Sequence, residues 1–285
     1  MDPASDTPIA SIVIPAYGAP DYLDVTLRSI TPQAAARGAE VIVVSDGPDA
    51  ANDAVTARHG ARLVTLPVHA GLNTARNAGI DAARSGLIVF VDQDVDAPEG
   101  WLDSVVAGAA AYPDLEVFGG PIRPRLENAL PACDRHPPPI TTLDAGPVDC
   151  DVRFVWGANM TMRRSAFERI GMFDPGLLGR GDEEEWLLRY AAAGGRIRYI
   201  AAAAIDHRRT AADSRLSALA RAAYGQGREV RHHDRRSGKT RPISAELRTL
   251  AGCAWHTVRR RCAYGIVMGA RTAGTLREAL AERRG

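Results

Sequence analysis

The stretch LIVFVDQDVDAPEGWL, residues 87–102, decides how the rest of the chain is interpreted. Five apolar residues lead into carboxylates at every second position, Asp92, Asp94 and Asp96. An apolar, β-branched run of this kind is typical of a strand that is buried on both faces of a sheet. Because alternate side chains of an extended chain point the same way, we expect Asp92 and Asp94 to converge beyond the strand. Their charges repel there unless a cation or water lies between them.

Similar apolar runs recur in the N-terminal half and alternate with helical patterns. Strands are predicted at residues 10–15, 40–45, 61–67 and 87–91, and helices over residues 22–30, 72–82 and 101–109. Strands that alternate with helices predict an α/β fold, here a doubly wound, mostly parallel sheet. Ligands of such sheets bind beyond the carboxyl ends of the strands, at the place where strand order reverses.

The second half of the chain begins with further alternating strands and helices and then becomes entirely helical. A strand is predicted at residues 154–162, helices at 164–171 and 183–193, and a strand at 196–205. After residue 209 the pattern becomes Arg-rich and helical, with helices predicted at residues 211–236, 245–261 and 263–283. We therefore predict an α/β domain of residues 1–209 and a basic, mainly helical C-terminal extension of residues 210–285.

Charge is divided unevenly along the chain, although the net charge is only +1. Residues 1–207 carry 28 acidic and 17 basic side chains, whereas residues 208–285 carry 6 and 18. A basic tail can attract an anionic membrane surface, mediate contacts of a homodimer, or cover a site on the acidic body. Binding of nucleic acid is disfavoured, because aromatic residues are sparse among the arginines.

Hydropathy and cysteine spacing both indicate a cytoplasmic protein. No apolar run approaches the roughly 20 residues of a spanning helix, and the polar start MDPASDTPIA is unlike a secretory signal. Any membrane contact would then be peripheral, at the inner face. The cysteines lack C-x-x-C spacing, so thiols are expected rather than a zinc site or a disulfide framework. They are Cys133, Cys150, Cys253 and Cys262.

The pair of Asp92 and Asp94 has three interpretations. Carboxylates that converge at a sheet edge suit Mn²⁺ or Mg²⁺, which can bridge the oxygens of a bound diphosphate. A solvated turn, with Asp96 capping the next helix, is the second interpretation. The third is a calcium-binding loop, which is disfavoured because Ala97 stands where the sharp turn of that loop needs glycine.

Context favours the first interpretation. The chain contains, in this order, SIVIPAYG (11–18), EVIVVSDGPD (40–49), GLNTARNAGIDAARSGLIVFVDQD (71–94), FVWGANMTMRRSAFERIGMFD (154–174) and GRGDEEEWLLR (179–189). Together these segments resemble the family 2 glycosyltransferases with the GT-A fold, over residues 9–207. The resemblance implies a metal-dependent inverting enzyme that moves a sugar from a nucleoside-diphosphate sugar to a hydroxyl of a small-molecule, glycan or lipid-linked acceptor.

The resemblance also implies roles for individual residues around the donor. Donor-binding residues would be Pro15, Ala16, Tyr17, Asp46, Arg76, Asn77, Asp92, Gly157 and Asn159, and the ligands of Mn²⁺ or Mg²⁺ would be Asp92, Asp94 and His207. Taken alone, several of these have structural alternatives. Asn77 could pack a helix, Asn159 could belong to a buried strand, and His207 could be a core histidine.

The acidic run at residues 182–185 supplies the general base implied by the resemblance. The family places its base in an acid-acid-x-acid pattern followed by arginine, and alignment on Arg189 puts Glu183 at that position. Asp182 is the second choice, because the family more often has aspartate. Taken alone, acids at a helix start stabilise its positive end, and Glu185 forms an ordinary pair with Arg189 four residues on.

Two functions of other classes remain open. A nucleotidyltransferase that makes sugar nucleotides usually carries a Gly-rich, basic loop after its first strand, whereas PAYGAPDYLD here is acidic. A non-catalytic nucleotide-sugar-binding module would tolerate loss of the base, whereas this chain keeps acids at every expected position.

Overall fold

The computed structural model describes residues 7–131, 133, 136, 139–177, 182–236 and 240–283, without the side chains of Asp182, His233 and Arg236. Contacts divide the chain into two units. The first comprises residues 1–123, 143–176 and 182–207, and the second comprises residues 124–142, 177–181 and 208–285. The second unit thus adds residues 124–142 to the C-terminal segment that the sequence set apart at residue 210.

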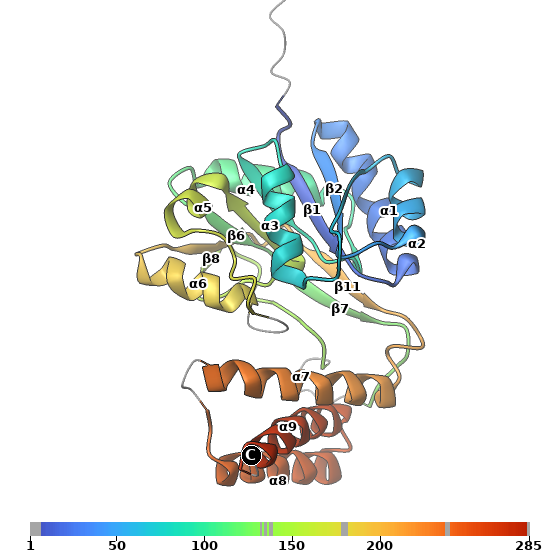
Figure 1. Cartoon of the computed structure of the whole chain (residues 1–285), viewed down its shortest axis with the longest axis vertical. Helices are drawn as coiled ribbons and strands as arrows, with labels where there is room; N and C mark the ends of the chain where they lie inside the picture. The colour runs from blue at the N-terminus through green and yellow to red at the C-terminus, as the bar shows by residue number, and fades with distance from the viewer. Residues whose placement is uncertain are drawn as a thin grey trace, which may run out of the picture. The chain divides into compact units, whose positions relative to one another are not determined.

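Within the described residues, the first unit contains an eight-stranded sheet of order β3-β2-β1-β4-β9-β6-β10-β8 (Figure 1). β1 lies parallel to β2 and β4, and β2 lies parallel to β3, whereas β9 is antiparallel to β4 and β6. Strand order reverses between β1 and β4, because the chain moves outward from β1 to β3 and returns on the other side of β1. The strands are β1 (Ser11–Ala16), β2 (Glu40–Ser45), β3 (Arg62–Thr65), β4 (Leu87–Phe90), β6 (Val117–Gly119), β8 (Cys150–Val152), β9 (Met160–Arg163) and β10 (Ile197–Tyr199).

Helices cover both faces of this sheet. Alternate residues of the buried strands belong to different cores, so that Ile12 and Ile14 pack on one side and Val13 on the other. The first core is closed by α1 (Pro20–Arg37), α2 (Ala50–Arg58) and α4 (Trp101–Ala111). The second is closed by α3 (Leu72–Ala82), which crosses in front of the sheet in Figure 1, α5 (Arg164–Ile170) and α6 (Asp182–Ala192).

A smaller sheet holds the acidic segment that follows β4. It has the order β5-β11-β7 among the described residues, with β5 (Val95–Asp96), β7 (Ile122–Leu126) and β11 (Ile205–Arg209). β5 and β11 are antiparallel, and Val95 stands opposite His207. This register brings His207, which is more than 100 residues away in sequence, beside Asp94.

Two of the strand predictions are wrong in part. In the first, residues 157–159 form a 3₁₀ turn, closed by the Asn159 N–H donating to the Trp156 carbonyl (2.9 Å), so β9 begins only at Met160. In the second, the run at residues 196–205 is divided between two sheets. The chain turns after β10, where the Ala203 N–H donates to the Ile200 carbonyl (3.1 Å), and then enters β11 of the second sheet.

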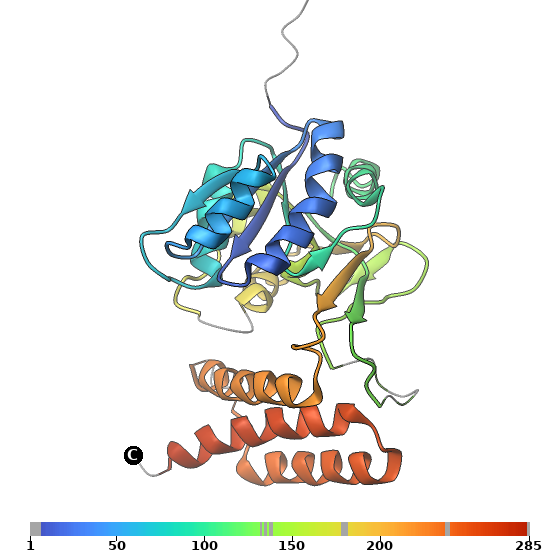
Figure 2. The same ribbon diagram turned by 90° about the vertical axis from the view of Figure 1, so that its right-hand side faces the viewer.

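The second unit contains three helices within the described residues, α7 (Leu216–Arg236), α8 (Ile243–Arg260) and α9 (Ala263–Ala281). α9 packs against both of the others (Figure 2). The α7–α9 contact is close, since a Cβ on Gly227 would stand 1.8 Å from the Arg271 carbonyl oxygen. None of the described helices combines the length and apolar character that crossing a bilayer demands.

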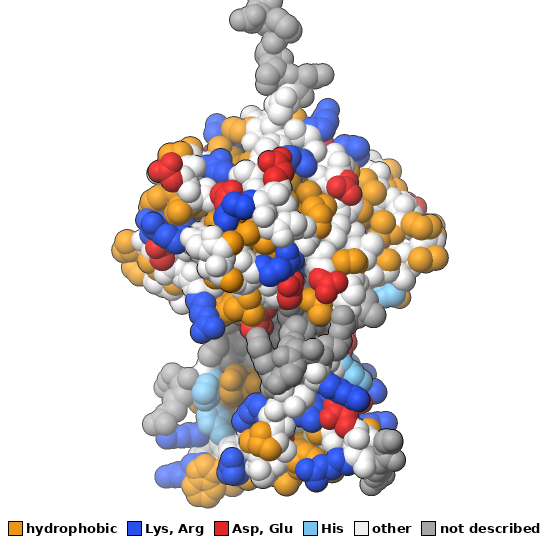
Figure 3. Space-filling model, turned by 60° about the vertical axis from the view of Figure 1, so that its left-hand side comes forward, with side chains coloured by type: hydrophobic (Ala, Val, Ile, Leu, Met, Phe, Trp, Pro, Cys, Tyr) orange, Lys and Arg blue, Asp and Glu red, His pale blue; other side chains and the backbone are white. Residues whose placement is uncertain are grey.

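The surface of the second unit keeps the basic character seen in its sequence. Basic side chains predominate on its face in Figure 3, beside hydrophobic ones. On α8 the exposed apolar residues Leu247, Trp255 and Val258 lie along one side, near the exposed Arg248 and Arg259. Membrane contact and dimer formation through this unit stay predictions.

Candidate active site

The reversal of strand order brings the loops after β1 and β4 together. The Tyr17 N–H donates to the Gln93 side-chain carbonyl (2.9 Å), and the Gln93 amide donates back to the Tyr17 carbonyl (3.2 Å). The buried Thr26 hydroxyl of α1 contacts the carbonyl oxygens of Gln93 and Val95, both at 2.7 Å, and accepts the Val95 N–H. These contacts fix the backbone on both sides of Asp94.

The two carboxylates predicted to converge do so, and the predicted histidine joins them. Ligand atoms of Asp92, Asp94 and His207 all lie within 4.8 Å of one another. The His207 Nε2 lies 3.1 Å from an Asp94 oxygen, and the His207 side chain is 3% exposed. Burial and the charge of Asp94 raise the pKa of the Asp92 carboxyl from 3.8 to about 6, although Arg76 and His207 oppose the shift. A cation among these groups would favour the ionised carboxylates.

Glu183 stands beside this cluster, in the first turn of α6. One of its carboxylate oxygens is 3.4 Å from the Arg76 guanidinium, and the other accepts the Gly157 N–H at 3.4 Å. The charges of Arg76 and Glu183 both act on Asp92, so the acid, the arginine and the carboxylate cluster share one site. The structure therefore brings together six residues from five separate segments: Arg76, Asp92, Asp94, Gly157, Glu183 and His207.

Aromatic packing holds α6 where Glu183 can reach this site. The buried α6 residue Trp186 packs against Phe167 and Phe173, which also contact Phe90, and Tyr190 stacks on Trp186, with neighbouring ring centroids separated by 5.4–6.3 Å. On the same helix, Arg189 pairs with Glu185 and donates to the carbonyls of Ile170 and Met172. The arginine used to align the acidic run thus anchors α6 to the loop after α5.

A second group of side chains lies at the end of β2. Asp46 accepts the N–H groups of Ala70 and Gly71 at 2.7 and 2.9 Å, and its carboxylate is 2.9 Å from the His69 Nδ1. The His69 ring stacks on Tyr17 at 4.2 Å, and Tyr17 is 63% exposed. Asp46 therefore organises the loop before α3 and places an exposed aromatic pair at the rim of the site.

Some predicted donor residues contact mainly protein. The Asn77 amide donates to the Phe173 carbonyl (2.9 Å) and accepts the Phe173 N–H (3.1 Å). The buried Asn159 donates to the Pro121 and Ala203 carbonyls and accepts from the Trp101 indole. Pro15 and Ala16 are buried in β1, so of these three predicted donor residues only Tyr17 is exposed. The side chain of Asp182 lies outside the described residues.

Sequence reasoning missed three residues that shape the site, Thr26, His69 and Gln93. Gln93 could have been found, because it lies between the two aspartates and must point away from them in an extended segment. Thr26 and His69 lie in a helix and a loop whose patterns carry no such signal.

The family model described as glycosyl transferase family 2 matches residues 11–171, a segment that contains most of the residues just described. The chain belongs to glycosyl transferase family 2. Its relatives in this family include the pre-mycofactocin glycosyltransferase of Mycobacterium tuberculosis, which is 32% identical over 222 residues, covering 73% of this chain and 45% of the relative. The glycosyltransferase AglE of Haloferax volcanii is 24% identical over 199 residues, covering 67% and 64%. The chain thus spans about half the length of the relatives it matches.

The fold of this family 2 chain resembles a solved mannosyltransferase of Pyrobaculum calidifontis, which was determined in complex with GDP-Man and Mn²⁺. The TM-score is 0.64 at 14% identity, and the match covers 97% of this chain and 88% of the mannosyltransferase. The similarity confirms the predicted GT-A fold and its α/β architecture.

The contact between Arg76 and Gly157 gives the first testable prediction for this family 2 site. A Cβ on residue 157 would stand 1.9 Å from the Arg76 Nη2, and Arg76 is only 2% exposed, so its guanidinium has little room to move. We expect Gly157→Ala to lower the unfolding free energy by about 1–3 kcal/mol. Because Arg76 contacts Glu183, turnover should also fall.

Gly86→Ala provides the matched control, because a Cβ at Gly86 meets no atom within 4 Å. Thermal melting and steady-state kinetics of both variants test the prediction. Equal melting temperatures and equal turnover for the two variants would show that the Arg76–Gly157 contact is unimportant.

Proposed function

We propose that this protein is a metal-dependent, inverting glycosyltransferase that moves a sugar from a nucleoside-diphosphate sugar to an acceptor hydroxyl. One observation carries the proposal: in a chain of family 2, the Glu183–Arg76 pair lies beside the Asp92, Asp94 and His207 cluster at the reversal of strand order. That edge is where open α/β sheets bind their ligands.

The carboxylate cluster fits a divalent cation. Two carboxylates and one imidazole offer oxygen and nitrogen donors, and the raised pKa of Asp92 reflects burial and then repulsion from Asp94, both of which a cation would offset. Asp92, Asp94 and His207 would hold Mn²⁺ or Mg²⁺, which would neutralise charge on the departing nucleoside diphosphate. The similar fold of the mannosyltransferase solved with GDP-Man and Mn²⁺ supports this assignment.

The nucleotide would extend from this cluster toward the loop before α3. The stacked rings of Tyr17 and His69 offer a flat, exposed surface that suits a nucleobase, and Asp46 keeps His69 in place. Asn77 and Asn159 would act indirectly, by holding the backbone around Phe173 and beneath the sugar site.

Glu183 would act as the general base. Its carboxylate would take the proton of the acceptor hydroxyl as that oxygen forms a bond to the anomeric carbon. The bond between the anomeric carbon and the diphosphate oxygen breaks with its electron pair on the diphosphate. Attack from the side opposite the leaving group inverts the configuration. Arg76 and the Gly157 N–H would hold the carboxylate in position through the contacts described above.

A screen of nucleotide sugars with and without Mn²⁺ tests the function directly. We expect one donor to raise the melting temperature in the presence of Mn²⁺ and to release its nucleoside diphosphate when an acceptor is added. Release of pyrophosphate from a nucleoside triphosphate and a sugar 1-phosphate would instead identify a nucleotidyltransferase. Donor-dependent stabilisation without any turnover across the acceptor panel would indicate a binding module.

A further inference from the structure

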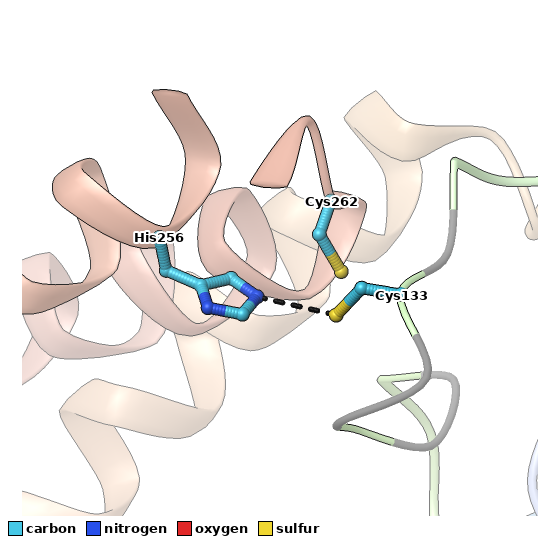
Figure 4. A group of neighbouring side chains, drawn as sticks. All are labelled: Cys133, His256 and Cys262. Atoms are coloured by element: carbon cyan, nitrogen blue, oxygen red, sulfur yellow. Dashed lines mark hydrogen bonds between the residues drawn. The ribbon is translucent and has the colours of Figure 1, made fainter. Parts of the chain in front are cut away.

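Three side chains of the second unit converge outside the proposed active site (Figure 4). The Cys133 Sγ lies 3.4 Å from the His256 Nε2, and the ligand atoms of Cys133, His256 and Cys262 are all within 4.8 Å of one another. Cys262 is 2% exposed, and the other two are partly buried. The residues come from the segment 124–142, from α8 and from the turn between α8 and α9.

Local backbone structure explains how this cluster forms. α8 ends at Arg260 and is capped by Arg261, which has a left-handed conformation (φ 51°), and Cys262 follows directly before α9. This sharp turn sets the Cys262 thiol near His256, which lies in the last two turns of α8. The Ala263 N–H at the start of α9 donates to the Pro131 carbonyl (2.7 Å), and that hydrogen bond holds the Cys133 segment against the turn.

The donors and their spacing match a thiophilic metal ion. Zinc binds thiolate sulfur at about 2.3 Å and imidazole nitrogen at about 2.0–2.1 Å in a tetrahedron, so a sulfur and a nitrogen on one ion lie about 3.5 Å apart. The separation of 3.4 Å between the Cys133 Sγ and the His256 Nε2 agrees with that value. Two thiolates and one imidazole are also the donor set that Zn²⁺ takes in proteins, whereas Mg²⁺ and Mn²⁺ prefer oxygen donors.

The surroundings leave room for a fourth ligand. A cavity of about 250 Å³ borders the cluster and is lined in part by Cys262, His136 and Tyr264. The His136 ring is stacked on Tyr264 at 4.1 Å with an angle of 5° between the planes. Stacking uses the face of the His136 ring and leaves its nitrogens free, so the fourth ligand of an ion held by the three residues would be either a water molecule in the cavity or the His136 imidazole.

We propose that Cys133, His256 and Cys262 bind one zinc ion that links Cys133 to the α8–α9 turn. Among the described residues of the second unit, few large apolar side chains are buried, namely Leu219, Val267 and Leu276, and small residues such as Ala223, Ala263 and Ala279 make up much of the rest. Units with little buried apolar surface commonly depend on a metal or a covalent link for stability. The ion would link residues 123 positions apart in the chain and so restrict the unfolded state.

This site is independent of the proposed transferase activity, and its test uses no turnover measurement. The full chain is purified after growth with zinc, freed of any affinity tag and assayed by mass spectrometry of metals. We expect about one zinc per chain, falling at least ~10-fold in Cys133→Ser, His256→Ala and Cys262→Ser. Replacement of the ion by Co²⁺ should give the thiolate-to-cobalt charge-transfer band and the visible bands of a tetrahedral site.

Two control variants identify which residues bind the ion. Cys253→Ser removes a thiol one turn before His256 on the same helix and should retain the zinc. Asp94→Asn should retain it as well, which separates this ion from one at the sheet edge. The proposal is overturned if the parent protein binds neither zinc nor cobalt in this way, if Cys133→Ser keeps its zinc, or if thiol mapping finds Cys133 and Cys262 joined in a disulfide. The cobalt spectrum of the parent decides the matter even if a variant fails to fold.

Discussion

Glu183→Gln is expected to lower kcat by about 10²–10⁴-fold, the usual contribution of general base catalysis. Glutamine has the same size and can still meet the Gly157 N–H, but its neutral amide cannot accept the proton of the acceptor hydroxyl. Donor affinity should change little, because Asp92, Asp94 and His207 stay in place. Single-turnover kinetics with the donor found by screening, together with calorimetric titration of that donor, measure the two effects separately.

The neighbouring Glu184 supplies the control for this prediction. It lies in the same turn of α6, but its side chain is exposed. Glu184→Gln should therefore turn over within about twofold of the parent, as surface substitutions usually have small effects. If the Glu183→Gln protein transfers sugar at the parental rate, Glu183 is not the general base, and Asp182 becomes the candidate.

Asp94→Asn should abolish the effect of Mn²⁺ on nucleotide binding. Asp94 contacts His207 at 3.1 Å and stands in the centre of the cluster, so the variant loses one charged ligand and the partner that orients another. Loss of an outer partner of a metal ligand typically costs 10–100-fold in affinity, and loss of the ligand itself should cost at least about 100-fold. Calorimetric titration of GDP and UDP, each with and without Mn²⁺, measures the change.

Asp103→Asn is the matched control for the loss of a carboxylate, because Asp103 lies on α4 in an exposed ion pair with Arg37. It should bind nucleotide and Mn²⁺ as the parent does. Melting of the metal-free proteins checks that Asp94→Asn is folded. If a folded Asp94→Asn protein shows unchanged Mn²⁺-dependent titration, the cation is held elsewhere.

The sequence predicted the fold well where one local pattern controls the structure. β1, β2 and β4 are rich in β-branched residues and are buried on both faces, so each could be predicted as a strand from its own sequence. The segment at residues 154–162 failed because its glycine and asparagine form a 3₁₀ turn whose reason is tertiary: Gly157 makes room for Arg76, and Asn159 bonds to two other loops.

In the candidate site, too, residues with a local sequence pattern could be predicted, whereas residues brought together by tertiary contacts could not. Asp92 and Asp94 lie two residues apart, so their convergence could be predicted from the sequence, although the structure achieves it through a turn at Gln93 and Asp94 after β4 and not by strand alternation. The roles assigned to Arg76, Glu183 and His207 came from resemblance, since nothing in their local patterns sets them apart from surface or core residues. The four cysteines are free thiols, as predicted, but the proximity of Cys133 and Cys262 to His256 could not be predicted, because residues distant in sequence have no spacing signature.

The contact between the Arg76 guanidinium and the backbone of Gly157 has a consequence for the side chains that positions 76 and 157 can carry during evolution. The Arg76 guanidinium fills the space that a side chain at position 157 would need, so position 157 cannot take a larger side chain unless position 76 also changes. In a library randomised at both positions, survivors with alanine or serine at 157 should carry a shorter side chain at 76. A shorter side chain at position 76 would leave Glu183 without its ion pair to Arg76. Evolutionary change at positions 76 and 157 is therefore constrained.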